Sequence, residues 1–310
     1  MEKPLPPIST DTPQYTVERR RSISQLYLLL APVLVLLACW MYVPVLNVLR
    51  MAFFKWDANL APGFVGLDNY IELVKDKYFW GSVRNMGLVL LFQLALPLLM
   101  PLLTAELIHS LQNMRARRIY INLFLLPSIV PTVVLYLVWG YMYDQAGPLV
   151  TVFRFLHLSW LSHNWLTDPH LALLALMFVG FPFSGGAGLL IYLAGLESVP
   201  CAVYDDACID GATWWERFIN IDLAFCLPHF RLLVVNTFTN ILGNFVGVML
   251  LTQRGPLIYT NMPGFYLYDK AFGLGRFGFA CAVGLALMAG AITMTIIIHR
   301  YLRSDIEYYV

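Results

Sequence analysis

The sequence is poor in charge. Only 13% of its 310 residues are Asp, Glu, Lys or Arg, about half the share of a soluble domain, whereas 59% are hydrophobic. So few charges could not cover the water-exposed surface of a soluble protein of this size. With a net charge of +1 and no long basic or acidic run, the chain also lacks the electrostatic footprint of a nucleic-acid-binding protein. The composition therefore indicates a protein that lies in membrane lipid.

Motifs for catalysis and for metal or nucleotide binding are also missing. The five cysteines are an odd number without C-x-x-C spacing, which disfavours a disulfide framework and a metal site. The chain has no G-x-x-x-x-G-K-[ST] phosphate loop, no H-E-x-x-H and no G-x-S-x-G. We therefore expect no catalytic residue, no metal and no cofactor in this chain. If it is part of a pump, ATP and Mg²⁺ are bound by a separate ATPase subunit.

Long uncharged runs predict the fold. About 20 apolar residues in a helix cross the hydrocarbon layer, and six runs reach that length. They predict an all-α, polytopic bundle of six transmembrane helices in one domain, 26–299, after a disordered cytoplasmic N-terminus, 1–25, and before a cytoplasmic tail, 300–310. The six runs are 26–49, 85–105, 119–143, 171–196, 232–253 and 277–298.

The distribution of charge predicts the orientation. Six spans place both termini on one side, and clusters of Arg at 19–21, 115–118 and 300–303 then flank the cytoplasmic ends. This predicts a multi-pass protein of a bacterial-type plasma (inner) membrane with cytoplasmic termini. No span carries a charged residue near its middle, which disfavours ion-coupled transport. Glu106 and His109 lie at the inner end of the second span, where we expect their side chains to reach water.

Between the fourth and fifth spans the chain reads VYDDACIDGATWWERF. Upstream, Ser198 can cap a helix that contains Pro200 in its first turn and runs to about Ile209. Gly211 can supply the left-handed residue that ends a helix, and the S/T-x-x-E pattern from Thr213 predicts a second helix. The loop, 197–231, is therefore expected to form a helix, a glycine turn and a helix on the inner face of the membrane.

The charge of this loop bears on its role. One interpretation is an amphipathic segment on the lipid surface, but such helices usually present Lys and Arg to anionic headgroups. The first helix here carries only acidic side chains, among them Asp205 and Asp206. Acidic residues around a short apolar face suit a groove in another protein, so a docking element is favoured.

The same segment resembles the cytoplasmic EAA loop of the permeases of binding-protein-dependent ABC importers, particularly the carbohydrate-type branch. FVGLDNYIELVKDKYFWGSVRN, LPSIVP, LAGLESVP and LTQRGP resemble further family segments in the same order. Asp205-Asp206, Asp222 and Ala224 depart from the usual Glu-Ala, Thr and Pro. The resemblance implies a coupling helix that docks on the ATPase. The coupling residues that it implies are Pro200, Asp205, Asp206, Ala207, Asp210, Gly211, Ala212 and Phe218.

Amide side chains form a stripe along the fifth span. Asn236, Asn240 and Asn244 recur every four residues, with Thr237 beside them. They can make hydrogen bonds between helices, or they can line a path for a hydroxyl-rich solute, and the two roles are compatible. In the third span Tyr136 and Trp139 can stack on sugar rings or belong to the aromatic belt at the interface.

The leading hypothesis is a permease subunit that forms half of the translocation path for a sugar or related polyol. The resemblance implies a second permease in a heterodimer, two ATP-binding cassette subunits and an extracytoplasmic solute-binding protein, and the spans imply contact with membrane lipid. Two alternatives remain: a permease of the same fold for a polyamine or phosphate ester, and a membrane scaffold or sensor that has lost transport.

Overall fold

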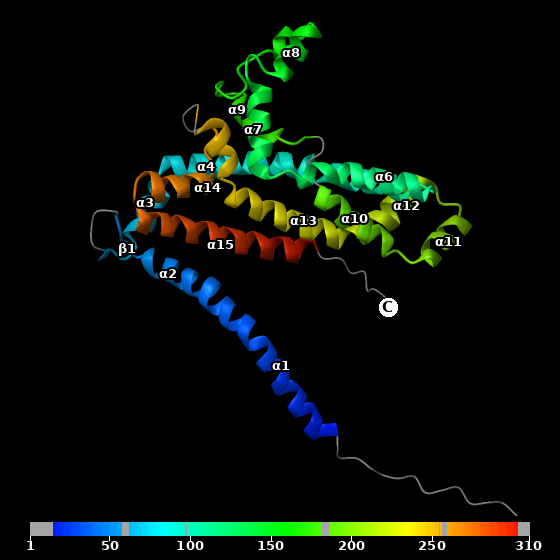
Figure 1. The fold of residues 1–310 in the computed structure, drawn as a ribbon, viewed down its shortest axis with the longest axis horizontal. Helices are drawn as coiled ribbons and strands as arrows, with labels where there is room; N and C mark the ends of the chain where they lie inside the picture. The colour runs from blue at the N-terminus through cyan, green and yellow to red at the C-terminus, as the bar shows by residue number, and fades with distance from the viewer. Residues whose placement is uncertain are drawn as a thin grey trace, which may run out of the picture.

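The computed structural model describes residues 15–57, 62–96, 98–181, 186–253, 255 and 259–302, with side chains from residue 25 onward except that of Ser159. The fold is helical apart from one two-stranded hairpin in these ranges (Figure 1). In chain order the first elements are α1 (Tyr15–Leu37), η1 (Ala38–Tyr42), α2 (Val43–Met51), β1 (Phe54–Lys55), β2 (Gly63–Phe64), α3 (Asp68–Lys75), α4 (Lys77–Ala95) and α5 (Leu99–His109). The central elements are α6 (Met114–Leu125), η2 (Leu126–Ile129), α7 (Thr132–Tyr143), α8 (Pro148–Phe155), η3 (Ser159–Leu161), α9 (Ala172–Met177) and α10 (Gly186–Glu197). The last are α11 (Cys201–Ile209), α12 (Trp214–Arg217), η4 (Phe218–Asp222), α13 (Leu223–Gly243), η5 (Val248–Thr252), α14 (Pro263–Tyr268), η6 (Asp269–Gly273) and α15 (Phe277–Tyr301).

Four helices are long and apolar enough to cross a membrane: Gln25–Met51, Lys77–His109, Trp214–Thr252 and Phe277–Tyr301. They contain the predicted first, second and sixth spans and all but the last residue of the fifth. Two bent pairs of helices raise the possible number of spans to six. The all-α membrane bundle that the sequence predicts is therefore confirmed, although the third and fourth spans differ from the expected straight helices.

The third predicted span, 119–143, is broken. Met114–Ile129 and Thr132–Phe155 meet at an angle of 87°, so that α6 lies along the bundle and α7 rises away from it (Figure 1). Val130 is extended, with φ −69° and ψ 125°. Pro131 explains this, because proline disfavours the α conformation in the residue before it and has no N–H for the helix. The length of the uncharged run gave no indication of this sharp bend.

The fourth predicted span, 171–196, is also interrupted. It contains α9 and α10, and Gly180 after α9 has a φ of +84°. Residues 182–185 lie outside the described ranges. The second bent pair joins α10 to α11 at 67°. The exposed carboxyl groups of α11 make it unsuitable for hydrocarbon, so we place it at the membrane surface.

The predicted disorder of residues 1–25 is wrong in part, because the backbone is helical from Tyr15. Glu, Arg and Gln in this stretch are good helix formers and extend the helix of the first span toward its N-terminus. Residues 1–14 lie outside the described ranges, as do 303–310 of the predicted tail. The tail's first two residues still belong to α15.

At the end of the bundle near α11 the core is formed by α5, α10 and α13. Leu102, Tyr192, Leu196 and Val234 are buried in one cluster there. Gly195 allows the close approach of α10 to α13, since a Cβ at this position would lie 2.8 Å from Nδ1 of His229. Small residues at such crossings are how membrane helices gain packing contacts where no hydrophobic effect drives them together.

The opposite end of the bundle is tied together by polar contacts near the hairpin. Arg276 donates two hydrogen bonds to Glu72, at 2.7 and 2.6 Å. Tyr266 donates to Oδ2 of Asp76 at 2.6 Å, and Nζ of Lys270 lies 3.6 Å from the same oxygen. These contacts connect α3 and the start of α4 to α14, η6 and the start of α15, and we call this group the outer clamp.

The outer clamp predicts a pH-dependent stability. Burial would raise the pKa of Asp76, whose side chain is 13% exposed, but hydrogen bonds from Tyr266 and Tyr78 and the charge of Lys270 lower it below its ordinary 3.8. A lowered pKa in the folded state stabilises the fold above the ordinary pKa, and this contribution disappears as the pH falls through the lowered value. We expect Asp76→Asn to reduce the free energy of unfolding by about 2 kcal/mol at pH 7.

Thermal unfolding in detergent between pH 7 and 3 tests this expectation. Asparagine is as good an N-cap for α4 as aspartate, so the variant removes the charge and keeps the cap. The difference between wild type and variant should shrink below pH 4. A difference that is the same at every pH would contradict the assignment.

Candidate functional site

The predicted helix–turn–helix of the inner loop is present. α11 ends at Ile209, and Gly211 has a φ of +71°. The N–H of Gly211 donates to the carbonyl of Cys208 at 3.2 Å, and that of Ala212 donates to the carbonyl of Ala207 at 2.9 Å. This pair of bonds is the Schellman motif, which satisfies the carbonyl groups at a helix end.

The second helix begins as predicted and the first does not. The Thr213 N–H donates to Glu216 at 2.8 Å, and the Glu216 N–H donates to Thr213 Oγ1 at 3.4 Å, which completes the capping box. The predicted cap by Ser198 is wrong: its hydroxyl donates to the carbonyl of Gly195 at 2.7 Å, and α11 starts one residue after Pro200. A hydroxyl that bonds back to its own preceding helix cannot cap the next one.

Some of the predicted coupling residues are buried or half-buried, and the others are exposed to solvent. The bundle covers the inward face of α11, where Val203, Tyr204 and Ala207 are half-buried, and Ala212 after the turn is half-buried too. Phe218 is 8% exposed and stacks on Trp214 with ring centroids 5.6 Å apart, so it supports the loop from behind. The predicted residues that are exposed are Pro200, Asp205, Asp206, Asp210 and Gly211.

Sequence reasoning missed Ile209. Its side chain is 83% exposed on the tip of α11, beside Asp205 and Asp210. An isoleucine that stands among acidic residues at the end of a helix was the available signal. Acidic and apolar groups together give this tip, which we call the docking tip (Asp205, Asp206, Ile209 and Asp210), both charge and apolar area for a protein partner. The docking tip lies at the opposite end of the bundle from the hairpin (Figure 1).

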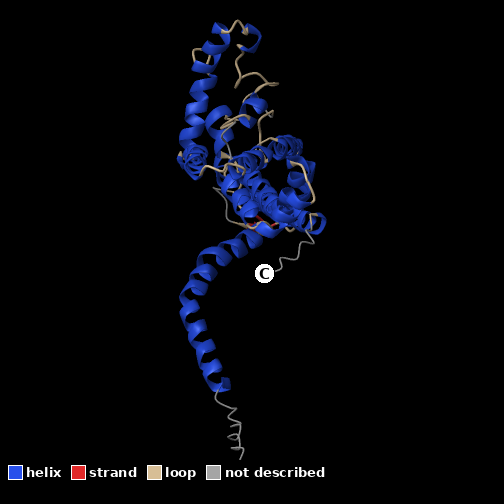
Figure 2. Ribbon diagram, turned by 90° about the vertical axis from the view of Figure 1, so that its right-hand side faces the viewer, coloured by secondary structure: helices blue, strands red, loops and turns tan. Residues whose placement is uncertain are grey.

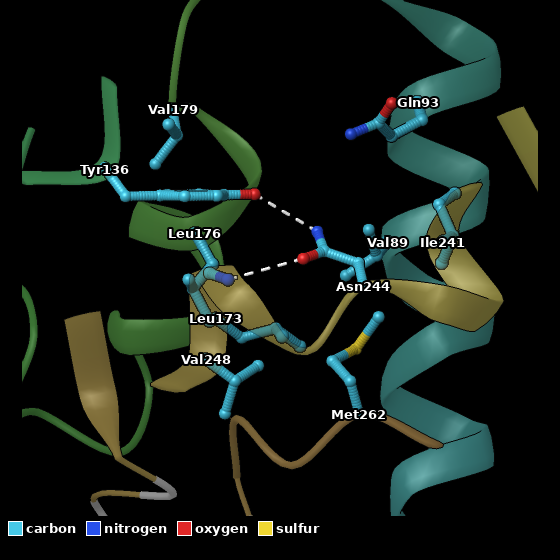
Figure 3. A pocket seen from close by; sticks show the side chains of 11 residues that line it. Val89, Gln93, Tyr136, Leu173, Leu176, Val179, Ile241, Asn244, Val248 and Met262 are labelled. Atoms are coloured by element: carbon cyan, nitrogen blue, oxygen red, sulfur yellow. Dashed lines mark hydrogen bonds between the residues drawn. The ribbon is translucent and has the colours of Figure 1, made fainter. Parts of the chain in front are cut away.

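A cavity lies where the fifth span breaks. α13 ends at Gly243, Asn244 is extended with φ −74° and ψ 100°, and a helical turn resumes near Gly247. The Asn244 amide donates to the hydroxyl of Tyr136 at 3.1 Å and accepts the N–H of Gly247 at 3.3 Å (Figure 3). Asn244 therefore caps the second helical segment and joins it to α7.

The cavity has a volume of about 70 Å³, well below the roughly 300–1,000 Å³ of small-molecule sites. This cavity therefore has room for a few water molecules and not for a sugar ring. Gln93 on α4 also reaches the cavity, and sequence reasoning missed it, although it is an amide within an uncharged apolar run (Figure 3). The lining residues are Val89, Gln93, Tyr136, Leu173, Leu176, Val179, Ile241, Asn244, Gly247, Val248 and Met262.

The other predicted path residues do not reach this cavity. Asn240 donates to the Oδ1 of Asn236 at 3.3 Å on the exposed face of α13, and Thr237 is half-buried. Trp139 packs on Tyr143 with ring centroids 5.3 Å apart. The structure therefore brings Asn244 and Tyr136 together. It leaves Asn236 and Asn240 on an exposed face of α13.

Metal ligands do not gather in the described part of the chain, where no three His, Cys, Asp or Glu side chains are placed to hold an ion. In that part the chemistry that the cavity offers is hydrogen bonding by neutral amide and hydroxyl groups.

Comparison with known proteins places these features in a family. Residues 98–308 match the binding-protein-dependent transport system inner membrane component. A probable ABC transporter permease of Pyrococcus horikoshii is 30% identical over 285 residues, which cover 90% of this chain and 96% of that one. The arabinooligosaccharides permease AraP of Bacillus subtilis is 24% identical, with 87% and 86% covered, and the sn-glycerol-3-phosphate permease UgpA of Shigella flexneri is 28% identical, with 91% and 95% covered.

A solved structure has the same fold. It comes from a bacterial ABC transporter that imports the acidic polysaccharide alginate, and the match has a TM-score of 0.80 at 21% identity. The match covers 95% of this chain and 100% of the other. At this identity the likeness establishes the fold.

Proposed function

Because the chain belongs to the family of binding-protein-dependent transport system inner membrane components, we propose that it is one of two permease subunits of an ATP-driven importer. It forms half of the translocation path for a sugar or related polyol in a bacterial-type inner membrane. It has no nucleotide site of its own, and two ATP-binding cassette subunits supply the energy.

The observation that carries the coupling role is the docking tip. It projects from the end of the bundle at which α15 ends, on a rigid helix–turn–helix, and it combines three carboxyl groups with an exposed isoleucine (Figure 1). The tip is held by the Schellman motif and the capping box, so a partner that binds it can push on a defined structure. Arg115, Arg118 and Arg300 lie on this side, which supports a cytoplasmic location for the tip and both termini.

The exposure of α1 supports a second permease. In the most apolar part of Gln25–Met51 no residue is buried, and the helix swings clear of the bundle (Figure 2). The small cavity and the exposed amides of α13 also fit a path that is completed by another subunit. For the solute-binding protein, support comes from a solved alginate transporter that is in complex with a periplasmic protein bound to an alginate pentasaccharide.

The cavity favours a neutral, hydroxylated solute. Its polar groups are the amides of Gln93 and Asn244 and the hydroxyl of Tyr136, and none of its lining residues is charged. Amides donate and accept hydrogen bonds in the way that sugar hydroxyls do, whereas a phosphate ester favours Arg or Lys. A phosphate ester is the second candidate, because a relative is a permease for sn-glycerol-3-phosphate. A polyamine permease and a scaffold without transport activity are the remaining alternatives.

Co-purification and uptake test the proposal together. The tagged chain is expressed with a candidate partner permease and a candidate ATPase from the same organism. Retained ATPase and uptake of labelled neutral oligosaccharides are measured, with sn-glycerol-3-phosphate and spermidine as competitors. Wild type should retain the ATPase and take up an oligosaccharide that neither competitor displaces.

Charge reversal at the docking tip provides the matched comparison. Asp210→Lys should lower retained ATPase at least about tenfold, because a repulsive charge then faces the partner. Asp68→Lys makes the same change on α3 at the far end and should retain the ATPase. Equal retention by both variants would overturn the coupling role, and retention without uptake of any solute would favour the scaffold.

A further inference from the structure

Buried polar side chains lie beneath the docking tip, where α11 meets the inner ends of α5 and α13. Glu106 on α5 and Asp222 at the end of η4 are each 2% exposed. The expectation that Glu106 reaches water is therefore wrong, because the inner loop folds over it. Tyr204 on α11, with Trp214 and Arg217 on α12, completes a group that we call the inner polar cluster.

Tyr204 connects the coupling helix to this cluster directly. Its hydroxyl donates to Oδ1 of Asp222 at 2.5 Å. The guanidinium of Arg217 lies over the Tyr204 ring, 5.4 Å from its centroid, and the ring of His109 is 6.1 Å away on the α5 side. Tyr204 of α11 thus contacts α12 and η4, which precede α13 in the chain, and also α5.

The second buried carboxyl group, that of Glu106, has fewer hydrogen bonds than it can accept. The Trp214 side chain faces Glu106, yet Oε2 of Glu106 has no hydrogen-bond partner among the described residues. Two buried carboxyl groups near each other repel when ionised, and water is excluded. Stabilisation comes from the Tyr204 hydroxyl, the Trp214 indole and the charge of Arg217, all three of which belong to α11 or α12. Movement of the tip away from the bundle would leave both carboxyl groups without these donors.

Apolar contacts of α11 are weaker than this polar anchor. Val203 and Ala207 on its inward face are only half-buried, and no residue of α11 is fully buried. Breaking a hydrogen bond to a buried carboxylate costs more than separating two half-exposed methyl groups. The Tyr204–Asp222 bond is therefore the strongest polar contact that the described residues provide between α11 and the bundle.

We propose that Tyr204 and Asp222 form a positioning pair that transmits movement of the coupling helix to α13, and this inference rests on the proposed function. Asp222 directly precedes α13, whose 21 residues make a rod of about 30 Å. The far end of that rod is the break at Asn244, which lines the cavity. A displacement of α11 that is carried through the pair moves the cavity wall, without the partner ATPase touching the path.

A double-mutant cycle in the full transporter tests the pair. Tyr204→Phe leaves Asp222 buried without its donor, Asp222→Leu leaves the hydroxyl without its acceptor, and the double variant replaces both by apolar groups. Each single variant should lower uptake per ATP hydrolysed about tenfold and lower thermal stability. The double variant should recover stability, because replacing both partners can be nearly neutral, while its uptake per ATP stays low.

Two further variants keep the test decisive. Asp222→Asn retains an acceptor oxygen and should keep most of the coupling even where the leucine variant folds poorly. Tyr301→Phe removes a hydroxyl from an 80% exposed tyrosine at the same end and should behave as wild type. All variants should still retain the ATPase, since the docking tip is unchanged.

The outcomes separate this inference from the function on which it rests. Recovery of both stability and uptake per ATP in the double variant would overturn the pair as a transmitting element and leave it a local packing contact. Normal coupling in Tyr204→Phe would overturn it as well. Failure of wild type to retain the ATPase would instead contradict the proposed function.

Discussion

Replacing Gly211 by proline is expected to abolish retention of the ATPase and solute uptake, while insertion into the membrane remains normal. The φ of Gly211 is +71°, and proline fixes φ near −65°. Proline also removes the N–H that donates to the carbonyl of Cys208. Both changes act at the turn that aims the docking tip, so the first helix would leave the second at a different angle. The cost is at least about 3 kcal/mol, confined to an exposed turn.

A series of substitutions at Gly211 separates the effect of backbone conformation from the effect of replacing the glycine. A Cβ at Gly211 would meet no atom within 4 Å, so only the backbone conformation limits the choice of residue. Asparagine tolerates the left-handed conformation, and Gly211→Asn should retain the ATPase at nearly the wild-type level. Gly211→Ala should fall between the two. Co-purification and uptake that rank Asn, Ala and Pro in this order support the turn as part of the coupling element, and full retention by the proline variant would contradict it.

Sequence patterns within a single segment correctly predicted the local backbone structure of that segment. The left-handed Gly211 and the capping box from Thr213 follow from which residue types satisfy the groups at helix ends, and both are present. Four of the six spans follow from the length of uncharged runs, since hydrocarbon thickness sets that length. In each case the determining interactions lie within a few residues or between the segment and lipid.

Features that depend on contacts between distant segments could not be predicted in this way. Tyr204 and Asp222 are 18 residues apart, and Asn244 and Tyr136 are 108 apart. Hydropathy treats Pro131 as one more uncharged residue, yet it bends the third span and so carries Tyr136 toward α13. The prediction of one amide stripe assumes an unbroken helix, whereas α13 ends at Gly243 and Asn244 lines the cavity.

The largest effect at the cavity is expected for Asn244→Leu, which should lower solute uptake about 100-fold without loss of the ATPase. Leucine can neither donate to Tyr136 nor accept the N–H of Gly247, so the second helical segment loses its cap and its link to α7. Two lost hydrogen bonds in a half-buried site together account for an effect of this size. Uptake of labelled oligosaccharide by whole cells, with the amount of inserted protein measured in parallel, checks the expectation.

Companion variants show whether the amide acts on the solute or only on the fold. Tyr136→Phe removes one hydroxyl from the cavity and should lower uptake about tenfold while the cap of the second segment persists. Thr293→Val lies on an exposed part of α15 outside the cavity and should leave uptake unchanged. Asn244→Asp keeps a good cap and an acceptor for the Gly247 N–H but places a carboxylate in the cavity. If a neutral hydroxylated solute is carried, the aspartate variant should retain more uptake than the leucine variant. If an anion is carried, it should retain none, because the new charge repels the solute at the point where the helix breaks.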